Sequence, residues 1–171
     1  MSLYAPSYVP RFRCLGPQCP HSCCEGWEVL IDPSTADFYA AVPGELGQRL
    51  RAALRRDGED LCFPLHGGRC PFWEPSGLCE IHRRLGEEHT SFICRTHPRF
   101  LDDYGARREL TLGASCPEVT RLVLEEDGEL LPQPEALWRE PGEPSEETPE
   151  LLTPLLLGRK AALALLRRPG P

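Results

Sequence analysis

The sequence has no long apolar run and no surplus of positive charge, and both absences exclude functions. No stretch approaches the roughly 20 consecutive apolar residues of a membrane-spanning helix, so we expect no membrane span. The first residues, MSLYAPSYVPRFRC, lack the apolar core of a secretory signal, which predicts a cytoplasmic location. The net charge is −7. Because nucleic acid is held by clustered basic side chains, we expect no nucleic-acid partner.

Several motifs of common enzyme classes are also absent. The chain contains no G-x-G-x-x-G segment, no phosphate-binding P-loop and no recognisable serine or cysteine triad. No internal repeat is visible. The function is therefore not predicted by a nucleotide-binding or hydrolase motif.

Cysteine, by contrast, is abundant. The chain has nine cysteines, and one short segment reads CLGPQCPHSCC. In a reducing compartment such density favours metal ligation over disulfides, and an odd number also speaks against a closed disulfide framework, which remains the alternative. Cys62 stands apart and is expected to be a small buried hydrophobe. The predicted metal ligands are the other eight: Cys14, Cys19, Cys23, Cys24, Cys70, Cys79, Cys94 and Cys116.

The spacing of these cysteines leaves two kinds of metal site open. Eight thiols allow one 4Fe–4S cluster with additional cysteines around it, or two zinc sites. The paired C-x2-C knuckles typical of zinc are absent, which favours iron–sulfur and keeps zinc as the alternative. The C-x3-C-x2-C pattern is absent as well, since Gly26 occupies its third position. Spacing does not decide which four cysteines act as ligands.

Charge and proline divide the chain into three predicted parts. Residues 1–126 form the cysteine-rich metal or iron–sulfur domain, for which we predict a small α+β fold of short helices and hairpins stapled by metal. Residues 127–150 are dominated by proline and glutamate and are predicted to be an acidic linker. Residues 151–171 hold four basic and no acidic side chains and are predicted to form a leucine-rich basic helix, at 155–168. We expect this helix to dock on a partner chain.

Turn and cap residues predict the local elements of the cysteine-rich part. Cys19-Pro20 predicts a helical turn and 27–31 a strand. Asp32-Pro33 starts a helix, and Pro43-Gly44 separates it from a second one that runs to Asp57-Gly58. The turn Pro75-Ser76-Gly77 places Cys70 and Cys79 on either side of a hairpin. Further predicted elements are helices over 79–88 and 90–95, a strand–turn–strand unit within 100–112, and a helix starting at Pro117.

Three separated blocks of the sequence together resemble a known family. They read YVPRFRCLGPQCPHSCCEGWEVLIDPST, CPFWEPSGLCEIHRRLGEEHTSFICRTHPR and LTLGASCPEVTRLVL. In this order they resemble the N-terminal cysteine-rich region of flagellin lysine-N-methylases, over roughly residues 4–124. They are also similar to a broader group of clustered-cysteine proteins described as zinc- or iron-chelating. Every cysteine except Cys62 falls where this family is expected to have one.

The resemblance implies an enzyme activity. It implies transfer of a methyl group from S-adenosylmethionine to lysine ε-amines of flagellin, by an enzyme that contains an iron–sulfur cluster. A lysine must lose its proton before it attacks, and the carboxylates considered for this role are Glu87, Glu88, Asp102 and Asp103, among which the sequence does not choose. The alternative is a non-catalytic zinc- or iron-binding module for metal handling or protein interaction.

Overall fold

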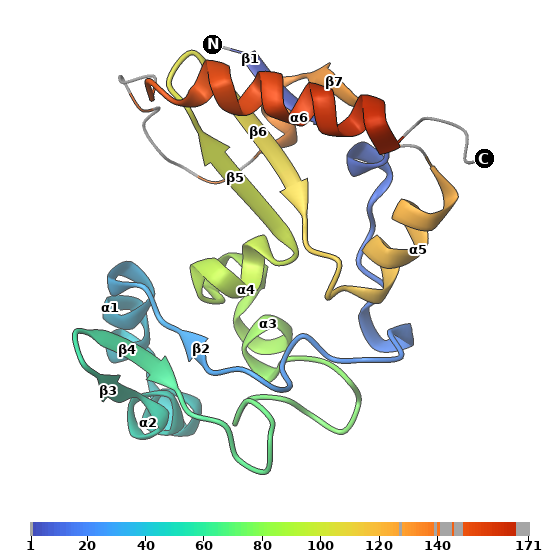
Figure 1. The fold of residues 1–171 in the computed structure, drawn as a ribbon. Coiled ribbons are helices and arrows are strands. Elements are labelled where there is room, and N and C mark those ends of the chain that lie inside the picture. Colours follow the sequence, from blue (N-terminus) through green and yellow to red (C-terminus); the bar gives the residue numbers. More distant parts are fainter. Residues whose placement is uncertain (1, 127, 139, 141–144, 146–148, 167–171) are drawn as a thin grey trace. The chain divides into compact units, whose positions relative to one another are not determined.

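The computed structural model describes residues 2–126, 128–138, 140, 145 and 149–166. The chain divides into two compact units, each built from separate stretches of sequence. The first unit comprises 1–10, 101–111 and 128–171, and the second comprises 11–100 and 112–127. Short helices and small sheets make the fold mixed α+β, as predicted (Figure 1).

The second unit contains most of the helices and a small sheet. Its sheet has three strands in the order β2-β4-β3, with antiparallel neighbours. The α-helices and strands are β2 (Val29–Leu30), α1 (Pro33–Ala41), α2 (Gly44–Ala53), β3 (Arg55–Asp57), β4 (Asp60–Phe63), α3 (Glu80–Leu85), α4 (Phe92–Thr96) and α5 (Pro117–Glu125). Short 3-10 turns are η2 (Gly16–Gln18) and η3 (Glu87–His89), and η1 (Val9–Arg11) covers the boundary at which the chain enters this unit.

Most of the predicted local elements of this unit are confirmed. Asp32 caps α1 by accepting the Thr35 N–H at 3.0 Å, and Pro43 separates α1 from α2. The hairpin turn between Cys70 and Cys79 is closed by hydrogen bonds from Glu74 N–H to the Leu78 carbonyl and from Gly77 N–H to the Glu74 carbonyl, both at 2.9 Å. The strand predicted over 27–31 is shorter and covers Val29–Leu30.

Two predictions of helix in this unit are wrong at their ends. The second helix stops at Ala53, and Arg55–Asp57 forms strand β3. The reason is a tight turn in which Gly58 has a φ of 58°, which lets Arg55–Asp57 pair with β4 instead of continuing the helix. The helical turn near Cys19-Pro20 lies earlier, at Gly16–Gln18, because Pro17 begins it; Cys19 itself is extended.

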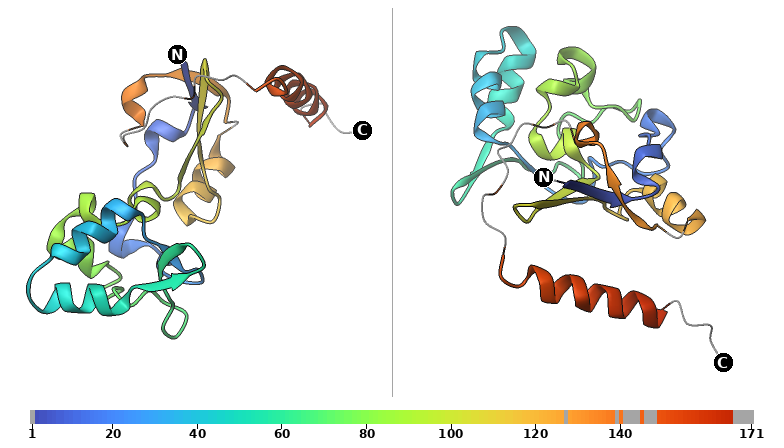
Figure 2. Two further views of the ribbon diagram at one scale, coloured as in Figure 1. Left: turned by 90° about the vertical axis from the view of Figure 1, so that its left-hand side faces the viewer. Right: turned by 90° about the horizontal axis from the view of Figure 1, so that it is seen from above.

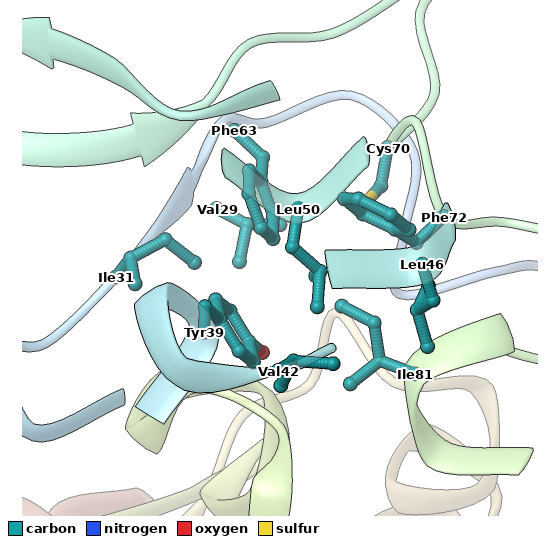
Figure 3. Packing of buried hydrophobic residues seen from close by; sticks show 10 residues of the cluster. All are labelled: Val29, Ile31, Tyr39, Val42, Leu46, Leu50, Phe63, Cys70, Phe72 and Ile81. Carbon is teal, nitrogen blue, oxygen red and sulfur yellow. The ribbon is translucent and has the colours of Figure 1, made fainter. Parts of the chain in front are cut away.

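A hydrophobic core lies between α1, α2 and the small sheet. Its rings are in direct contact: Tyr39 stacks on Phe63 with centroids 5.9 Å apart, and Phe63 meets Phe72 at 4.8 Å. Figure 3 shows these side chains together with Leu50 and the sulfur of Cys70. The core members are Val29, Ile31, Tyr39, Val42, Leu46, Leu50, Phe63, Cys70, Phe72 and Ile81. Apolar packing therefore holds this unit together, and stapling by metal is not shown.

Helix α2 approaches the end of α1 so closely that only glycine fits at residue 47. A Cβ added to Gly47 would overlap the carbonyl oxygen of Val42. We expect Gly47→Ala to lower the free energy of unfolding by about 2 kcal/mol, because the backbone must move, even though alanine favours helix. Gly158→Ala is the matched control: no atom lies within 4 Å of its added Cβ, so it is expected to be neutral or slightly stabilising. Denaturant unfolding measures both, and equal stabilities would contradict the close packing at Gly47.

The first unit contains a four-stranded sheet in the order β5-β6-β1-β7, which Figure 2 shows from two further sides. Strand β1 (Ser2–Pro6) runs parallel to β6 (Arg107–Leu112) and antiparallel to β7 (Leu130–Gln133). Strand β5 (Arg99–Asp103) and β6 form the predicted strand–turn–strand unit. The buried carboxylate of Glu109 pairs with Arg107 at 2.6 Å and with Arg159 at 2.8 Å. The buried charge of Glu109 is thus balanced by two arginines.

The last quarter of the chain adds three described elements to this unit. Within 127–150, the predicted acidic linker, Leu130–Gln133 forms β7 and Glu135–Leu137 forms the 3-10 turn η4. The predicted C-terminal helix is α6 (Leu152–Leu166), and the predicted helical residues 167 and 168 lie outside the described residues. Leu155, Leu157 and Leu165 are exposed on α6. No described helix is both long and apolar enough to span a membrane.

Candidate functional site

Four of the eight candidate ligands gather around one small cavity in the second unit. Cys24, Cys70, Cys79 and Cys94 all line this cavity, which has a volume of about 20 Å³. The name "cysteine cavity" is used for it below. The rest of its wall is formed mainly by apolar and hydroxyl side chains, namely Val29, Ile31, Tyr39, Phe63, Ile81, Thr90 and Ser91. Cys24 and Cys94, which are 70 positions apart in the sequence, thus line the same cavity.

Short backbone contacts bring these four cysteines together. The Cys70 N–H donates to the Cys24 carbonyl at 2.8 Å. An ion pair between the adjacent residues Arg69 and Glu25 joins the same two segments. The hairpin then returns the chain so that Cys79 precedes α3 as its N-cap residue. Cys94 lies in the first turn of α4, where its N–H donates to the Ser91 carbonyl at 3.0 Å.

The electrostatics of the cavity oppose free thiolates. Burial raises the pKa of the Cys70 thiol to about 12 and that of Cys94 to about 11. Burial also raises the pKa of Cys79, and negative charge on neighbouring cysteines raises all three further. Without a cation, the thiols of Cys70, Cys79 and Cys94 are therefore protonated at neutral pH.

Backbone N–H groups near the cavity partly offset the rise in thiol pKa that burial causes. The N–H of Phe72 lowers the pKa of Cys70, and the N–H groups of Ile81 and His82 lower that of Cys79. Hydrogen bonds of this kind stabilise negative charge on sulfur, and they are a means by which proteins adjust metal–thiolate sites. The backbone at the cavity is thus arranged to support charged sulfur once a cation offsets the cost of burial.

The remaining predicted ligands have different positions. Cys23 is exposed, and a negative charge on it would raise the pKa of Cys70, Cys79 and Cys94. A hydrogen bond to Cys24 raises the pKa of the Cys23 thiol itself. Cys14, Cys19 and Cys116 do not line the cysteine cavity. Cys62 is buried, with 3% exposure, as predicted for a small hydrophobe.

The donor set of the cavity fits a metal, but coordination geometry is not formed. Four thiols with supporting donors are the ligand chemistry of structural zinc and of iron–sulfur clusters. Within the described residues, however, no three His, Cys, Asp or Glu side chains are arranged closely enough to hold an ion. Ligation by the eight cysteines therefore stays a prediction, with Cys24, Cys70, Cys79 and Cys94 as the set that the fold brings together.

A second, polar cavity is formed by some of the same elements as the first, although the two cavities have no lining residue in common. It has a volume of about 160 Å³ and is lined by Ser34, Thr35, Phe38, Glu88, His89 and Arg95. Helix α1 and the segment from Glu88 to Arg95 border both cavities. The ring of His89 stacks on Phe38 with centroids 4.0 Å apart, and Glu88 is 72% exposed. Among the four carboxylates considered as proton acceptors, Glu88 lines this cavity, while Asp102 and Asp103 belong to the other unit.

Sequence reasoning missed the hydroxyl-bearing residues of the cysteine cavity. Tyr39 is fully buried, and its hydroxyl donates to the His89 carbonyl at 3.0 Å. Thr90 and Ser91 are also buried. The segment 90–91 was recognisable only as the start of a short helix, because no spacing rule links a capping residue to a thiol.

Comparison with known proteins agrees with the resemblance seen in the three sequence blocks. The chain is 29% identical over 126 residues to a lysine-N-methylase of Salmonella typhimurium, and the match covers 70% of this chain. It is 29% identical over the same length to the flagellar biosynthetic protein FliU of Salmonella muenchen, of which it covers 75%. The chain thus resembles the flagellin lysine-N-methylase family. No family model and no solved structure matches it.

The extent of the match differs between these relatives. The chain covers only 31% of the Salmonella typhimurium lysine-N-methylase and 31% of that of Salmonella choleraesuis. It thus spans about a third of the length of these enzymes.

Proposed function

We propose that this chain is a metal-binding, lysine-N-methylase-like protein that takes part in methyl transfer from S-adenosylmethionine to lysine ε-amines of flagellin. The observation that carries the proposal is the convergence of Cys24, Cys70, Cys79 and Cys94 on one cavity. The similarity to the Salmonella lysine-N-methylases and to FliU supports the part of the proposal that concerns methyl transfer and the flagellum. An iron–sulfur cluster held by these cysteines would supply electron-transfer chemistry, and zinc would supply structural support.

The residues around the polar cavity supply a place for the lysine side chain. The amine must be neutral to accept a methyl group, so its proton must pass to a nearby base. Glu88 lines this cavity, and its carboxylate is largely exposed to an incoming side chain. The flat face formed by Phe38 and His89 offers an apolar surface for the methylene stem. We therefore assign Glu88 the role of the proton acceptor.

Glu88→Gln tests this assignment. We expect the rate of methyl transfer to flagellin to fall by about 100-fold, which is typical for loss of a general base. Metal content should stay unchanged, because Glu88 does not line the cysteine cavity. Glu87→Gln is the matched control, as Glu87 is an exposed neighbour that does not line the cavity. Equal rates in the two variants would exclude Glu88 as the base.

A non-catalytic metal-binding module is the second candidate function. The cysteine cavity, at about 20 Å³, is close to the room needed by one water molecule and therefore matches a single ion better than a cluster. Four thiolates around one ion are the ligand set of a structural zinc site.

Titration of S-adenosylmethionine into anaerobically prepared, metal-loaded protein separates the two functions. The methylase proposal predicts saturable binding and methylation of purified flagellin. The metal-module candidate predicts retained metal without S-adenosylmethionine binding. Absence of binding with intact metal would therefore remove the enzyme function from this chain.

A further inference from the structure

Ser91 is a buried residue whose hydroxyl group makes no hydrogen bond within the described residues. Its side chain is 2% exposed, and its Oγ has no hydrogen-bond partner among the described residues. A buried hydroxyl without a partner is costly, and such groups in folded proteins call for an explanation. Ser91 lines the cysteine cavity together with the four cysteines, so the explanation is sought there.

The position of Ser91 in the fold makes its free hydroxyl unusual. Ser91 is the N-cap residue of α4, a place where serine normally accepts a hydrogen bond from the second or third N–H of the helix. Here its side chain makes no cap hydrogen bond. The third N–H of the helix, that of Cys94, donates to the Ser91 carbonyl at 3.0 Å instead. The hydroxyl is thereby released from capping.

The thiol of Cys94 lies on the same helical turn as this hydroxyl. Ser91 is the N-cap residue of α4 and Cys94 is its third residue, so the two side chains are three positions apart on one turn, and both line the cysteine cavity. For Cys70 and Cys79, backbone N–H groups of Phe72, Ile81 and His82 supply hydrogen bonds to sulfur. The side chain of Ser91 is placed to be the corresponding donor for Cys94.

We propose that Ser91 is a positioning residue of the cysteine cavity, whose hydroxyl donates a hydrogen bond to the Cys94 sulfur when that sulfur is bound to a metal ion. This inference rests on the proposed metal site, and it adds to that site a residue that is not itself a metal ligand. A donor on a metal-bound thiolate fixes the direction of the sulfur and disperses its negative charge. Ser91 therefore slows metal release while contributing nothing to the stability of the metal-free fold.

Co²⁺ provides a test that does not depend on methyl transfer. Wild type and Ser91→Ala are loaded with Co²⁺ under reducing, anaerobic conditions, and release to excess chelator is followed by the visible absorption of thiolate-bound cobalt. We expect Ser91→Ala to release Co²⁺ about tenfold faster, as for loss of one hydrogen bond to a charged group. In the metal-free state, its denaturant midpoint should equal or exceed that of wild type.

Ser34→Ala is the matched control. The Ser34 hydroxyl already donates to Asp32 at 2.7 Å, so its removal should leave cobalt release unchanged. Equal release rates for Ser91→Ala and wild type would overturn the role of Ser91 and leave the metal site intact. A loss of stability in metal-free Ser91→Ala would show a structural role and would also overturn it. If wild type takes up no Co²⁺, the metal site itself fails, and the role of Ser91 fails with it.

Discussion

Cys79→Ser is expected to abolish metal binding by the purified protein. Cys79 lines the cysteine cavity, and its sulfur is supported by the N–H groups of Ile81 and His82, so it is among the best prepared of the four ligands. Serine oxygen is a poor replacement for a thiolate in zinc and iron–sulfur sites. Because metal-binding energy adds to folding energy, the melting temperature of the metal-loaded protein should fall as well. Metal content per chain and thermal unfolding measure the two effects.

Two cysteine variants serve as controls for this prediction. Cys62→Ala should keep its metal, because Cys62 is a buried residue of β4 outside the cavity lining. Cys14→Ser should also keep the metal of this cavity, since Cys14 is exposed and does not line it. Wild-type metal content in Cys79→Ser would remove Cys79 from the ligand set. Metal loss in Cys14→Ser would instead show that ligation extends to the N-terminal cysteines.

Asp32→Ala is expected to lower the free energy of unfolding by about 3 kcal/mol. The carboxylate caps α1 through the Thr35 N–H and also accepts the Phe92 N–H of α4 at 2.7 Å. Loss of an N-cap costs about 1 kcal/mol, and hydrogen bonds to a charged group contribute about 1.5–3 kcal/mol. Asp32 thereby joins α1 to the helix that carries Cys94, so its removal should also weaken metal retention. Denaturant unfolding of the metal-free protein isolates the effect on stability.

The contribution of Asp32 should depend on pH in a defined direction. Burial would raise the pKa of this carboxyl, but hydrogen bonds from Phe92, Ser34 and Thr35 outweigh it and lower the pKa from 3.8 to about 2. A depressed folded-state pKa stabilises the fold above about pH 4, by about 2.5 kcal/mol, and this stabilisation is lost as the pH falls through 2. Asp32→Asn keeps a good N-cap residue without the charge. Its stability deficit should shrink between pH 4 and pH 2, and a constant deficit would contradict this account.

Local signals in the sequence predicted much of the second unit. Capping and turn residues determine their own neighbourhood, which is why α1, the hairpin around Gly77 and the start of α5 are confirmed. The error at Arg55–Asp57 has a different cause. Helical periodicity continued through Leu54, but pairing with β4 supplied the backbone hydrogen bonds instead. Tertiary pairing of this kind is not visible in a local pattern.

The sequence predicted which type of residue forms the candidate site, but not which of the eight cysteines lie together in it. Spacing identified eight cysteines, yet it could not select the four that share a cavity, because Cys24, Cys70 and Cys94 meet only through long-range packing. Ser91 and Tyr39 could not be predicted as cavity residues for the same reason, since their burial at the cavity depends on how α1 and α4 pack. The parallel pairing of β1 with β6 was not predictable from the sequence either, because 100 residues lie between the end of β1 and the start of β6.

Anaerobic purification followed by iron, zinc and acid-labile sulfide analysis tests the central claim most directly. The account predicts bound metal in wild type and its loss when Cys24, Cys70, Cys79 or Cys94 is replaced by serine. Iron with matching sulfide would support the methylase-like function, whereas zinc without sulfide would support the metal-binding module. Protein that contains neither metal, and that takes up neither on reconstitution under reducing conditions, would contradict the account.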